Sequence, residues 1–319
     1  MVAELHLTDL GNARRFLVVH GSDLRYCHPF GRWYVWDGTR WKEDSIGEVQ
    51  MRAKDCIRYM YRDAAAEEDD QRRKALAKHA IRSESSQKIR AMVELLKTEP
   101  GIPILPDELD GDPWLLNCLN GTLDLHTGEL KPHNTLDCIT KVVPVTHDAN
   151  ATCPEWYRFL DRIFAGRQDL ITFVQRAVGY SLTGCTDERV LFILHGIGAN
   201  GKSTFLETIA LLLGDYAMRT TTDTLLARRG DSIPNDVARL RSARFAHASE
   251  AEQGRRLAEA KIKDLTGGDT ITARFMRGEW FEYRPEFKLW LGTNHKPVIR
   301  GTDTAIWDRI RLIPFDVRI

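Results

Sequence analysis

Short apolar runs separated by polar or helix-like segments dominate the chain after Cys185. Val190–Leu194 reads VLFIL, a continuous apolar run that is typical of a central parallel strand because both faces of such a strand are buried. Further predicted elements are strands at Arg244–Glu250, Phe287–Asn294 and Arg309–Phe315, and a helix at Thr204–Leu213. Strands that alternate with helices predict an α/β fold with a parallel sheet.

Two amphipathic helices are predicted just before this region. The first begins at Pro154, a residue that suits the first turn of a helix. Each segment places its apolar residues on one face, namely Trp156, Phe159, Leu160, Ile163 and Phe164 in the first and Leu170, Phe173, Val174, Ala177 and Val178 in the second. Stripes with this period are typical of packing surfaces.

The pattern over the first 150 residues predicts a smaller α+β domain. An aromatic alternation at Arg32–Lys42 is broken by Asp37-Gly38, which predicts a β-hairpin. Ile46–Lys97 is rich in helix formers and contains no proline, so it predicts helices interrupted near Glu67–Asp70. Pro100, Pro103 and Pro106 then indicate a linker, and Leu115–Leu130 contains turn signals that indicate small strands. We therefore expect one domain at 1–150 and a second at 151–319.

Composition excludes several classes of protein. The chain has 319 residues, 43% of them hydrophobic, and no apolar run of 18 or more, so we expect a globular protein without a membrane span or signal peptide. Its six scattered cysteines form no CxxC pair, which favours free thiols in a reducing cytoplasm over a zinc site. The 45 basic and 45 acidic residues give a net charge of zero, so any contact with nucleic acid must depend on local charge.

A phosphate-binding motif follows the VLFIL run. Residues 196–203 read GIGANGKS, which matches G-x-x-x-x-G-K-[ST] in the required order of strand, loop and helix. Such a loop turns consecutive N–H groups toward phosphate, and the helix N-terminus adds positive charge. We expect Lys202 to reach the β- and γ-phosphates of ATP and Ser203 to ligate Mg²⁺. The predicted nucleotide-binding set is Gly196, Ile197, Gly198, Ala199, Asn200, Gly201, Lys202, Ser203 and Thr204.

Three later strand ends carry candidate catalytic groups. Glu250 ends a strand that we expect beside the phosphate strand, where it would act as general base and help to hold Mg²⁺. Ser249 stands where many related motors have a second acid. Asn294 ends another strand and is a candidate sensor of the γ-phosphate. Arg309 is a candidate arginine finger for a neighbouring subunit's site, with Arg311 in reserve.

The order of these motifs resembles the superfamily III helicases, and more narrowly the phage/plasmid primase-helicase C-terminal family that includes poxvirus primase-helicases. The similar stretches are LFILHGIGANGKST, RFAHASE, IKDLTGGDTITARF, FKLWLGTNHKP and WDRIRLIPF, with PWLLNCLNGTLDLHTGEL upstream. The resemblance implies a P-loop ATPase sheet of the AAA+ type with a helical collar at 151–185. It also implies a hexameric ring that uses ATP to translocate on single-stranded or forked DNA, alongside replication proteins such as a primase, in a bacterial cytoplasm if the source is a phage or plasmid.

The same resemblance locates a DNA contact. The stretch Lys263–Arg277 matches the one that carries the DNA-gripping hairpin in this superfamily, and Arg277-Gly278 suits a hairpin turn. We expect Arg274 and Arg277 to bind phosphates and Phe275 to stack on a base. Two other functions remain open: a kinase of a small molecule, and a non-enzymatic module that binds DNA or a replication partner.

Two departures from the family accompany the resemblance. The family usually continues past the IPF motif into a winged-helix-like region, so we expect a shortened chain with altered affinity for DNA. No primase catalytic domain is recognised. Asp110 and Asp112 form a D-x-D pair, but it lies in a proline-flanked segment, and we interpret it as a turn.

Overall fold

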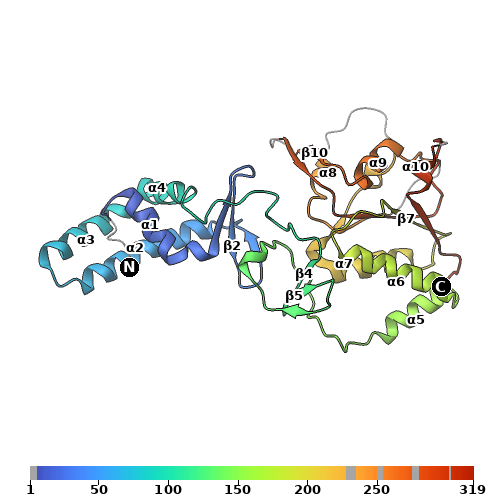
Figure 1. The fold of residues 1–319 in the computed structure, drawn as a ribbon, viewed down its shortest axis with the longest axis horizontal. Helices are drawn as coiled ribbons and strands as arrows, with labels where there is room; N and C mark the ends of the chain where they lie inside the picture. Colours follow the sequence, from blue (N-terminus) through green and yellow to red (C-terminus); the bar gives the residue numbers. More distant parts are fainter. Residues whose placement is uncertain (1–5, 228–234, 250–253, 275–279, 302) are drawn as a thin grey trace. The chain divides into compact units, whose positions relative to one another are not determined.

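The computed structural model describes residues 6–227, 235–249, 254–274, 280–301 and 303–319. Contacts between residues divide it into two compact units (Figure 1). Unit 1 comprises residues 1–111 and 134–140, and unit 2 comprises residues 112–133 and 141–319. The units therefore do not divide at residue 150, because the strands at Leu115–Lys131 pack with the second unit. Among the described residues, no helix combines the length and apolar character needed to cross a bilayer.

Unit 1 is built from helices and one small antiparallel sheet. Its elements are α1 Asp9–His20, η1 Gly21–Asp23, β1 Leu24–Cys27, β2 Arg32–Trp36, β3 Trp41–Glu43, α2 Glu48–Ala66, α3 Asp70–Ser83, α4 Ser86–Leu96 and η2 Thr135–Asp137. The sheet has the order β1-β2-β3, and Gly38 turns the β2–β3 hairpin with a φ of 97°. The predicted hairpin and the helical break near Asp69 are both confirmed, since the Asp69 carboxylate accepts the Arg72 N–H at the start of α3.

The proline-rich segment around Pro103 is not a linker, so that prediction was wrong. Tyr26 exchanges backbone hydrogen bonds with this segment, donating to the Ile102 carbonyl at 2.8 Å and accepting from the Ile104 N–H at 3.0 Å. Ile102 is fully buried and Ile104 is 4% exposed. Isoleucines interleaved with the prolines supply apolar surface that packs against β1, which overrides the tendency of proline to mark loops.

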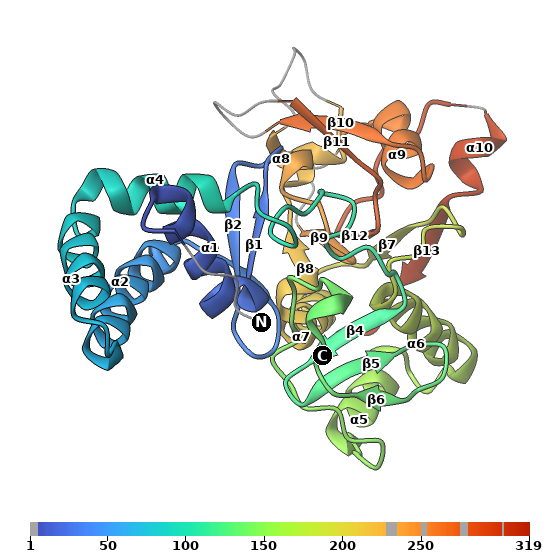
Figure 2. The ribbon, with the colours of Figure 1, turned by 60° about the vertical axis from the view of Figure 1, so that its left-hand side comes forward.

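Unit 2 contains a parallel sheet with helices on both faces. Its elements are β4 Leu115–Cys118, β5 Gly121–Asp124, β6 Leu130–Lys131, α5 Pro154–Ile163, α6 Gln168–Leu182, β7 Leu191–His195, α7 Lys202–Leu213, η3 Gly214–Tyr216, β8 Ala217–Arg219, η4 Thr222–Thr224, α8 Asn235–Ala238, β9 Phe245–Ser249, α9 Glu259–Thr266, β10 Ile271–Arg274, β11 Trp280–Tyr283, β12 Lys288–Thr293, α10 Thr304–Trp307 and β13 Ile310–Pro314. The small antiparallel sheet β4-β5-β6 and the β10–β11 hairpin lie beside it (Figure 2).

The five-stranded sheet has the order β13-β7-β12-β9-β8, and every neighbouring pair is parallel. Side chains alternate between its faces. Phe192 and Trp290 belong to a core with α5, α6 and α7, whereas Ile193 and Leu291 belong to a core with α8, α9 and the β10–β11 hairpin. Figure 1 shows these two helical layers on opposite sides of the strands. The predicted α/β class and parallel sheet are confirmed.

The position of β9 corrects one prediction. We expected this strand beside β7, but β12 lies between them and pairs with both. All six residues of β12 are buried, so this strand is suited to a central position with a neighbour on each side. The three-residue strand β8 at the sheet edge was not predicted, because it is too short to show a period.

Candidate phosphate-binding site

The loop between β7 and α7 is shaped by its glycines. Gly198 and Gly201 have φ values of 40° and 85°, a region of backbone conformation that favours glycine. Gly196 lies so close to the segment after β13 that a Cβ on it would stand 2.0 Å from the Phe315 carbonyl oxygen. The loop therefore requires glycine at Gly196 for space and at Gly201 for conformation.

The side chain of Lys202 is held inside this loop. It is 7% exposed, and its ammonium group donates to the Gly196 carbonyl at 2.6 Å and to the Asn200 side-chain oxygen at 2.9 Å. Asn200 is 4% exposed and donates through its own amide to the Phe315 carbonyl at 2.9 Å. Burial lowers the pKa of Lys202 from its ordinary value of 10.5. In the part of the chain that the structure describes, the acceptors of this buried ammonium group are both neutral, so its positive charge can attract an anion.

Helix α7 adds backbone donors to the same place. It begins at Lys202, and its first helical hydrogen bond runs from the Phe205 N–H to the Gly201 carbonyl at 2.9 Å. The amides of Lys202, Ser203 and Thr204 precede that bond, so the helix provides no acceptor for them. Donors at a helix N-terminus, aligned with its dipole, attract phosphate.

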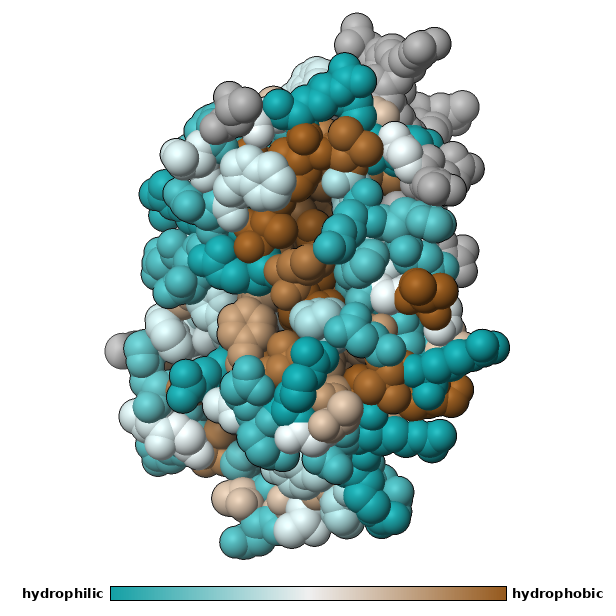
Figure 3. Space-filling view, turned by 90° about the vertical axis from the view of Figure 1, so that its right-hand side faces the viewer, coloured by the Kyte–Doolittle hydropathy of each residue, from teal (hydrophilic) through white to brown (hydrophobic). Residues whose placement is uncertain are grey.

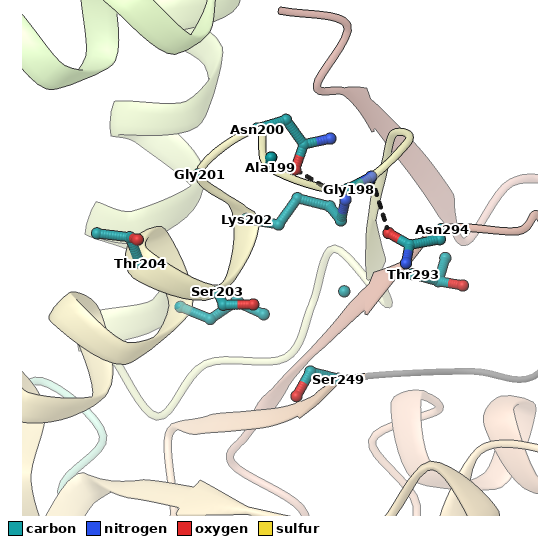
Figure 4. Close-up of a pocket in the computed structure, with 12 residues that line it drawn as sticks. Gly198, Ala199, Asn200, Gly201, Lys202, Ser203, Thr204, Ser249, Thr293 and Asn294 are labelled. Carbon is teal, nitrogen blue, oxygen red and sulfur yellow. Dashed lines mark hydrogen bonds between the residues drawn. The ribbon is translucent and has the colours of Figure 1, made fainter. Parts of the chain in front are cut away.

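A cavity of 270 Å³ lies against the loop and is lined by residues of the loop, of α7 and of the ends of strands β9 and β12 (Figure 4). Its lining residues are Gly198, Ala199, Asn200, Gly201, Lys202, Ser203, Thr204, Leu206, Ser249, Gly292, Thr293 and Asn294. Figure 4 shows Asn294 and Lys202 on the same side of the cavity and Ser249 across from Ser203. The cavity is therefore lined by the glycine loop and by polar side chains together with the apolar Leu206.

Asn294 contacts the loop, while its role as a sensor of the γ-phosphate stays a prediction. Its side-chain oxygen accepts the Gly198 N–H at 3.4 Å, and it follows directly after β12, which neighbours β7. Thr293 also lines the cavity, and sequence reasoning missed it. Its hydroxyl donates to the His295 carbonyl at 2.7 Å, which fixes the turn that carries Asn294. In the sequence, the only sign of a role for Thr293 is the polar Thr293-Asn294 pair at the end of the apolar strand FKLWLGTN.

Several predicted residues do not line this cavity or cannot be placed. Glu250, Phe275 and Arg277 lie outside the described residues. Ser249, which precedes Glu250, ends β9 and lines the cavity. Arg309 does not line the cavity; its Nε donates to the Thr266 hydroxyl at 3.0 Å and its Nη1 to the Ala305 carbonyl at 2.6 Å. The reserve candidate, Arg311, donates to the Asp308 carbonyl at 2.6 Å.

The segment in which we predicted a DNA-contacting hairpin contains the antiparallel strands β10 and β11, which pair from Ile271↔Tyr283 to Arg274↔Trp280. The predicted turn at Arg277-Gly278 lies outside the described residues, and the contact with DNA stays a prediction. The Arg274 guanidinium lies over the Trp280 ring, 4.7 Å from its centroid. Trp280 is 55% exposed, so this stacked pair is accessible to solvent near the end of the hairpin. A cation and a flat aromatic ring are both side-chain types that contact single strands.

The D-x-D pair belongs to the structural framework. Asp110 has a φ of 56°, and its carboxylate accepts the Thr140 N–H at 2.6 Å and the Thr140 hydroxyl at 2.5 Å. Asp112 accepts the Trp114 N–H at 2.9 Å. The two carboxylates therefore have separate partners, each closing its own turn.

Comparison with known proteins relates the chain to a family. A family model described as D5 N terminal like matches residues 13–165, and a family of unknown function (DUF5906) matches residues 194–309. "Putative helicase L207/L206" of Acanthamoeba polyphaga mimivirus is 29% identical over 214 residues, which cover 65% of this chain and 22% of that protein. "Putative primase C962R" of African swine fever virus (isolate Tick/Malawi/Lil 20-1/1983) is 22% identical over 214 residues, covering 64% of this chain and 22% of that protein. The chain is a D5-like primase-helicase relative.

This D5-like chain spans less than a quarter of the length of those relatives, and the same holds for "Putative helicase 121R" of Invertebrate iridescent virus 3, which is 29% identical and covered to 23%. Among solved structures, the apo structure of the NrS-1 C terminal region (305-718) superposes with a TM-score of 0.52 at 11% identity. The match covers 96% of this chain and 62% of that one. At this identity the likeness concerns the fold alone. The curated relatives come from viruses, and an origin in a phage or plasmid stays a prediction.

Proposed function

We propose that this D5-like chain is the ATP-driven motor of a DNA replication helicase, with ATP and Mg²⁺ bound at the loop between β7 and α7. The observation that carries the proposal is the Lys202 ammonium group, buried in a glycine loop at the N-terminus of α7. Among the described residues it donates to a backbone carbonyl and to an amide oxygen. A polyphosphate offers stronger, charged acceptors to the same group.

The residues around the cavity are of the types that carry out phosphoryl transfer. Lys202 and the first amides of α7 would bind the phosphates, and the Ser203 hydroxyl is an oxygen ligand of the kind that Mg²⁺ prefers. Bound Mg²⁺ would neutralise charge between the β- and γ-phosphates. Glu250 would take the proton of the attacking water, by its sequence position next to Ser249, and Asn294 would sense the γ-phosphate from the end of β12.

Coupling to DNA rests on the β10–β11 hairpin. The names of the viral relatives, putative helicases and primases, are consistent with a role in replication. In a ring of six subunits, Arg274 and Arg277 would contribute positive charge toward the channel although the chain has no net charge. Contacts of this kind would be made to phosphates and would be indifferent to DNA sequence.

The deciding experiment measures ATP binding and hydrolysis with and without single-stranded DNA. We expect hydrolysis that rises with DNA and with protein concentration. Lys202→Ala should lower hydrolysis by about 10²-fold, because a charge that stabilises the transferring phosphoryl group is lost. Glu250→Gln should bind ATP normally and lose turnover, since only the proton acceptor is removed.

Each alternative function gives a different result. Hydrolysis that DNA and protein concentration leave unchanged, together with phosphorylation of a small molecule, would identify a kinase. DNA binding by a chain that neither binds nor hydrolyses ATP would identify a non-enzymatic module. Normal turnover in Glu250→Gln would remove that residue from the mechanism.

A further inference from the structure

Helix α3 of unit 1 exposes most of its surface. Of its fourteen residues, all of which the structure describes, Ala80 and Ser83 are the buried ones. In both ribbon views α3 lies at the outer margin of unit 1, beside α2 (Figure 1, Figure 2). Packing within unit 1 therefore determines few of the side chains on this helix.

After its first residue, α3 carries charges of one sign. Residues 71–83 read QRRKALAKHAIRS, which contains five lysines and arginines and no acid. The acids that precede this run pair with its beginning. Arg72 lies 3.0 Å from Glu67, and Asp70 forms ion pairs with both Arg73 and Lys74. The negative charge is thus concentrated at the start of the helix, and the rest of α3 is left with an excess of positive charge.

Lys78 and Arg82 lie in this later part of α3. Both are exposed, and in the part of the chain that the structure describes neither forms an ion pair. The next acid along the chain, Glu84, accepts the Tyr61 hydroxyl of α2 at 2.8 Å. Two cations on the same helix are therefore available to a partner outside unit 1.

The spacing of the cations gives them a common direction. Lys74, Lys78 and Arg82 recur every four residues, so they follow one face of α3 in steps of about 6 Å. We call these three residues the basic stripe. Like charges four residues apart weaken a helix. Arg82 lies in the last turn, where the helix dipole favours a cation, but Lys78 lies in the middle and gains nothing from it. Helix stability therefore does not account for the basic stripe.

The surroundings of the basic stripe favour one class of partner. Helix α3 contains no Phe, Tyr, Trp or Met, the residues in which protein interfaces are enriched. Ile81 is 62% exposed, but single exposed apolar side chains are common on protein surfaces. By contrast, apolar side chains gather in a band on the face of the molecule that Figure 3 shows. A row of cations without an apolar centre is suited to a phosphodiester backbone, which is contacted mainly through charge.

We propose that the basic stripe on α3 binds the phosphodiester backbone of nucleic acid and gives unit 1 a contact of its own. The stripe is about 12 Å long, and phosphates of one strand repeat about every 3.4 Å along a duplex, so each of its three cations can contact a phosphate. This contact involves neither the ATP site nor the β10–β11 hairpin. It therefore goes beyond the proposed function and does not depend on nucleotide.

The test measures binding of the full chain to labelled single-stranded DNA by fluorescence anisotropy, without nucleotide and at several salt concentrations. Lys78→Ala combined with Arg82→Ala removes two cations, and alanine keeps the helix because its helix propensity is high. The slope of log affinity against log salt should become shallower by about 1.4, or about 0.7 for each lost phosphate contact, and affinity should fall about tenfold. Duplex DNA and single-stranded RNA of equal length show which nucleic acid binds most tightly, and each should lose affinity in the variant.

A charge-matched variant separates this contact from a general effect of net charge. Lys54→Ala combined with Arg58→Ala also removes two exposed cations, from α2, and should leave the salt slope unchanged. Arg274→Ala, in the β10–β11 hairpin, should add to the effect of the α3 variant rather than replace it. Circular dichroism checks that all variants are folded.

Three outcomes would overturn the proposal. The first is an unchanged salt slope and affinity for every nucleic acid in the α3 variant. The second is an equal loss in the α2 and α3 variants, because the effect would then follow net charge alone. The third is unchanged binding of nucleic acid together with lost binding of polyglutamate, which would assign the basic stripe to an acidic protein. None of these outcomes affects the proposed ATP site, which ATP titration of the same variants measures separately.

Discussion

Because Gly196 has no side chain, the loop between β7 and α7 can lie close to the segment after β13. A Cβ at this position would stand 2.0 Å from the Phe315 carbonyl oxygen and 2.4 Å from the Asn200 amide nitrogen. Both atoms belong to the bond that joins the loop to the segment after β13. The motif fixes the residue type from sequence, but this particular neighbour becomes visible only in the fold.

We therefore expect Gly196→Ala to weaken ATP binding and to lower the free energy of unfolding, because the backbone of the loop must move away from Phe315. Gly179→Ala is the matched control. Gly179 lies in α6 with open space around it, and alanine in a helix is favoured over glycine by about 1 kcal/mol. Urea unfolding would measure the stability of both variants, and ATP titration would measure their affinity for ATP. ATP affinity in Gly196→Ala equal to that of Gly179→Ala would show that the loop tolerates a side chain there.

Lys288 is a buried cation at the start of β12. It is 1% exposed, and its ammonium group donates to the carbonyls of Thr183, Cys185 and Glu286. Burial, and then the charge of Arg244, lower the pKa of Lys288 from 10.5 to about 7. The folded chain therefore releases this proton well below the pH at which the unfolded chain does.

This difference predicts a pH-dependent stability. Between about pH 7 and 10.5 the unfolded state binds the proton and the folded state does not, so the contribution of Lys288 to stability rises with pH across that window. The free energy of unfolding of the wild type, minus that of Lys288→Met, should rise from pH 6.5 to pH 9.5 by roughly a few kcal/mol at most. Lys54→Met, at an exposed position on α2, is the control and should show no such trend. A pH-independent difference for Lys288→Met would contradict the lowered pKa.

At the scale of elements, Arg244 joins the small β4-β5-β6 sheet to the large one. It precedes β9, is 2% exposed, and donates to the carbonyls of Leu182, Asp112 and Leu115 at 2.8, 3.3 and 2.9 Å. Its guanidinium also lies over the Tyr216 ring, 4.7 Å from the centroid. One planar side chain thus satisfies carbonyls from two segments far apart in sequence, which a lysine could not do.

Arg244→Met should leave those buried carbonyls without a donor, at a cost of about 1–3 kcal/mol for each acceptor that water cannot reach. We expect faster amide hydrogen exchange in β4 and β5 than in β7, because the small sheet loses its attachment first. Arg239→Met, at an exposed position in the same unit, should leave hydrogen exchange in β4, β5 and β7 unchanged. Uniform exchange changes across unit 2 would mean that Arg244 supports the whole unit rather than this junction.

The sequence predicted individual helices and strands better than it predicted which of them lie side by side. The apolar run of β7, the alternation in β2 and the helices α2, α3 and α4 are local patterns, and the structure contains them close to the expected bounds, whereas α1 was not predicted. The insertion of β12 between β7 and β9 is a matter of sheet order, which residue periodicity does not encode. For the same reason the Thr266 and Ala305 partners of Arg309, and the contact of Asn200 with Phe315, could not be read from the motifs.

At the scale of the whole molecule, the question is whether an ATP site is completed by a second copy of the chain. The cavity of unit 2 is lined by a lysine, amides and hydroxyls from the loop, α7 and the ends of two strands of the same unit, while Arg309 does not line it. Arg309 instead donates hydrogen bonds to the Thr266 hydroxyl at the end of α9 and to the Ala305 carbonyl in α10. An arginine finger accelerates phosphoryl transfer by about 10³ to 10⁵ in related systems, so a finger supplied by a second copy would have a large effect on hydrolysis.

If Arg309 acts in trans, then two inactive variants should complement each other. Arg309→Ala should bind ATP nearly normally and lose cooperative hydrolysis, whereas Lys202→Ala should lose hydrolysis through its own loop. In a mixture, some interfaces combine an intact loop with an intact arginine, so hydrolysis should recover in part and should vary with the mixing ratio. Arg311→Ala mixed in the same way tests the reserve candidate, because its guanidinium holds only the backbone at Asp308 and Ile310 among the described residues. Mixed oligomers that form normally, yet show no recovery with either arginine variant, would place the missing positive charge elsewhere in the chain.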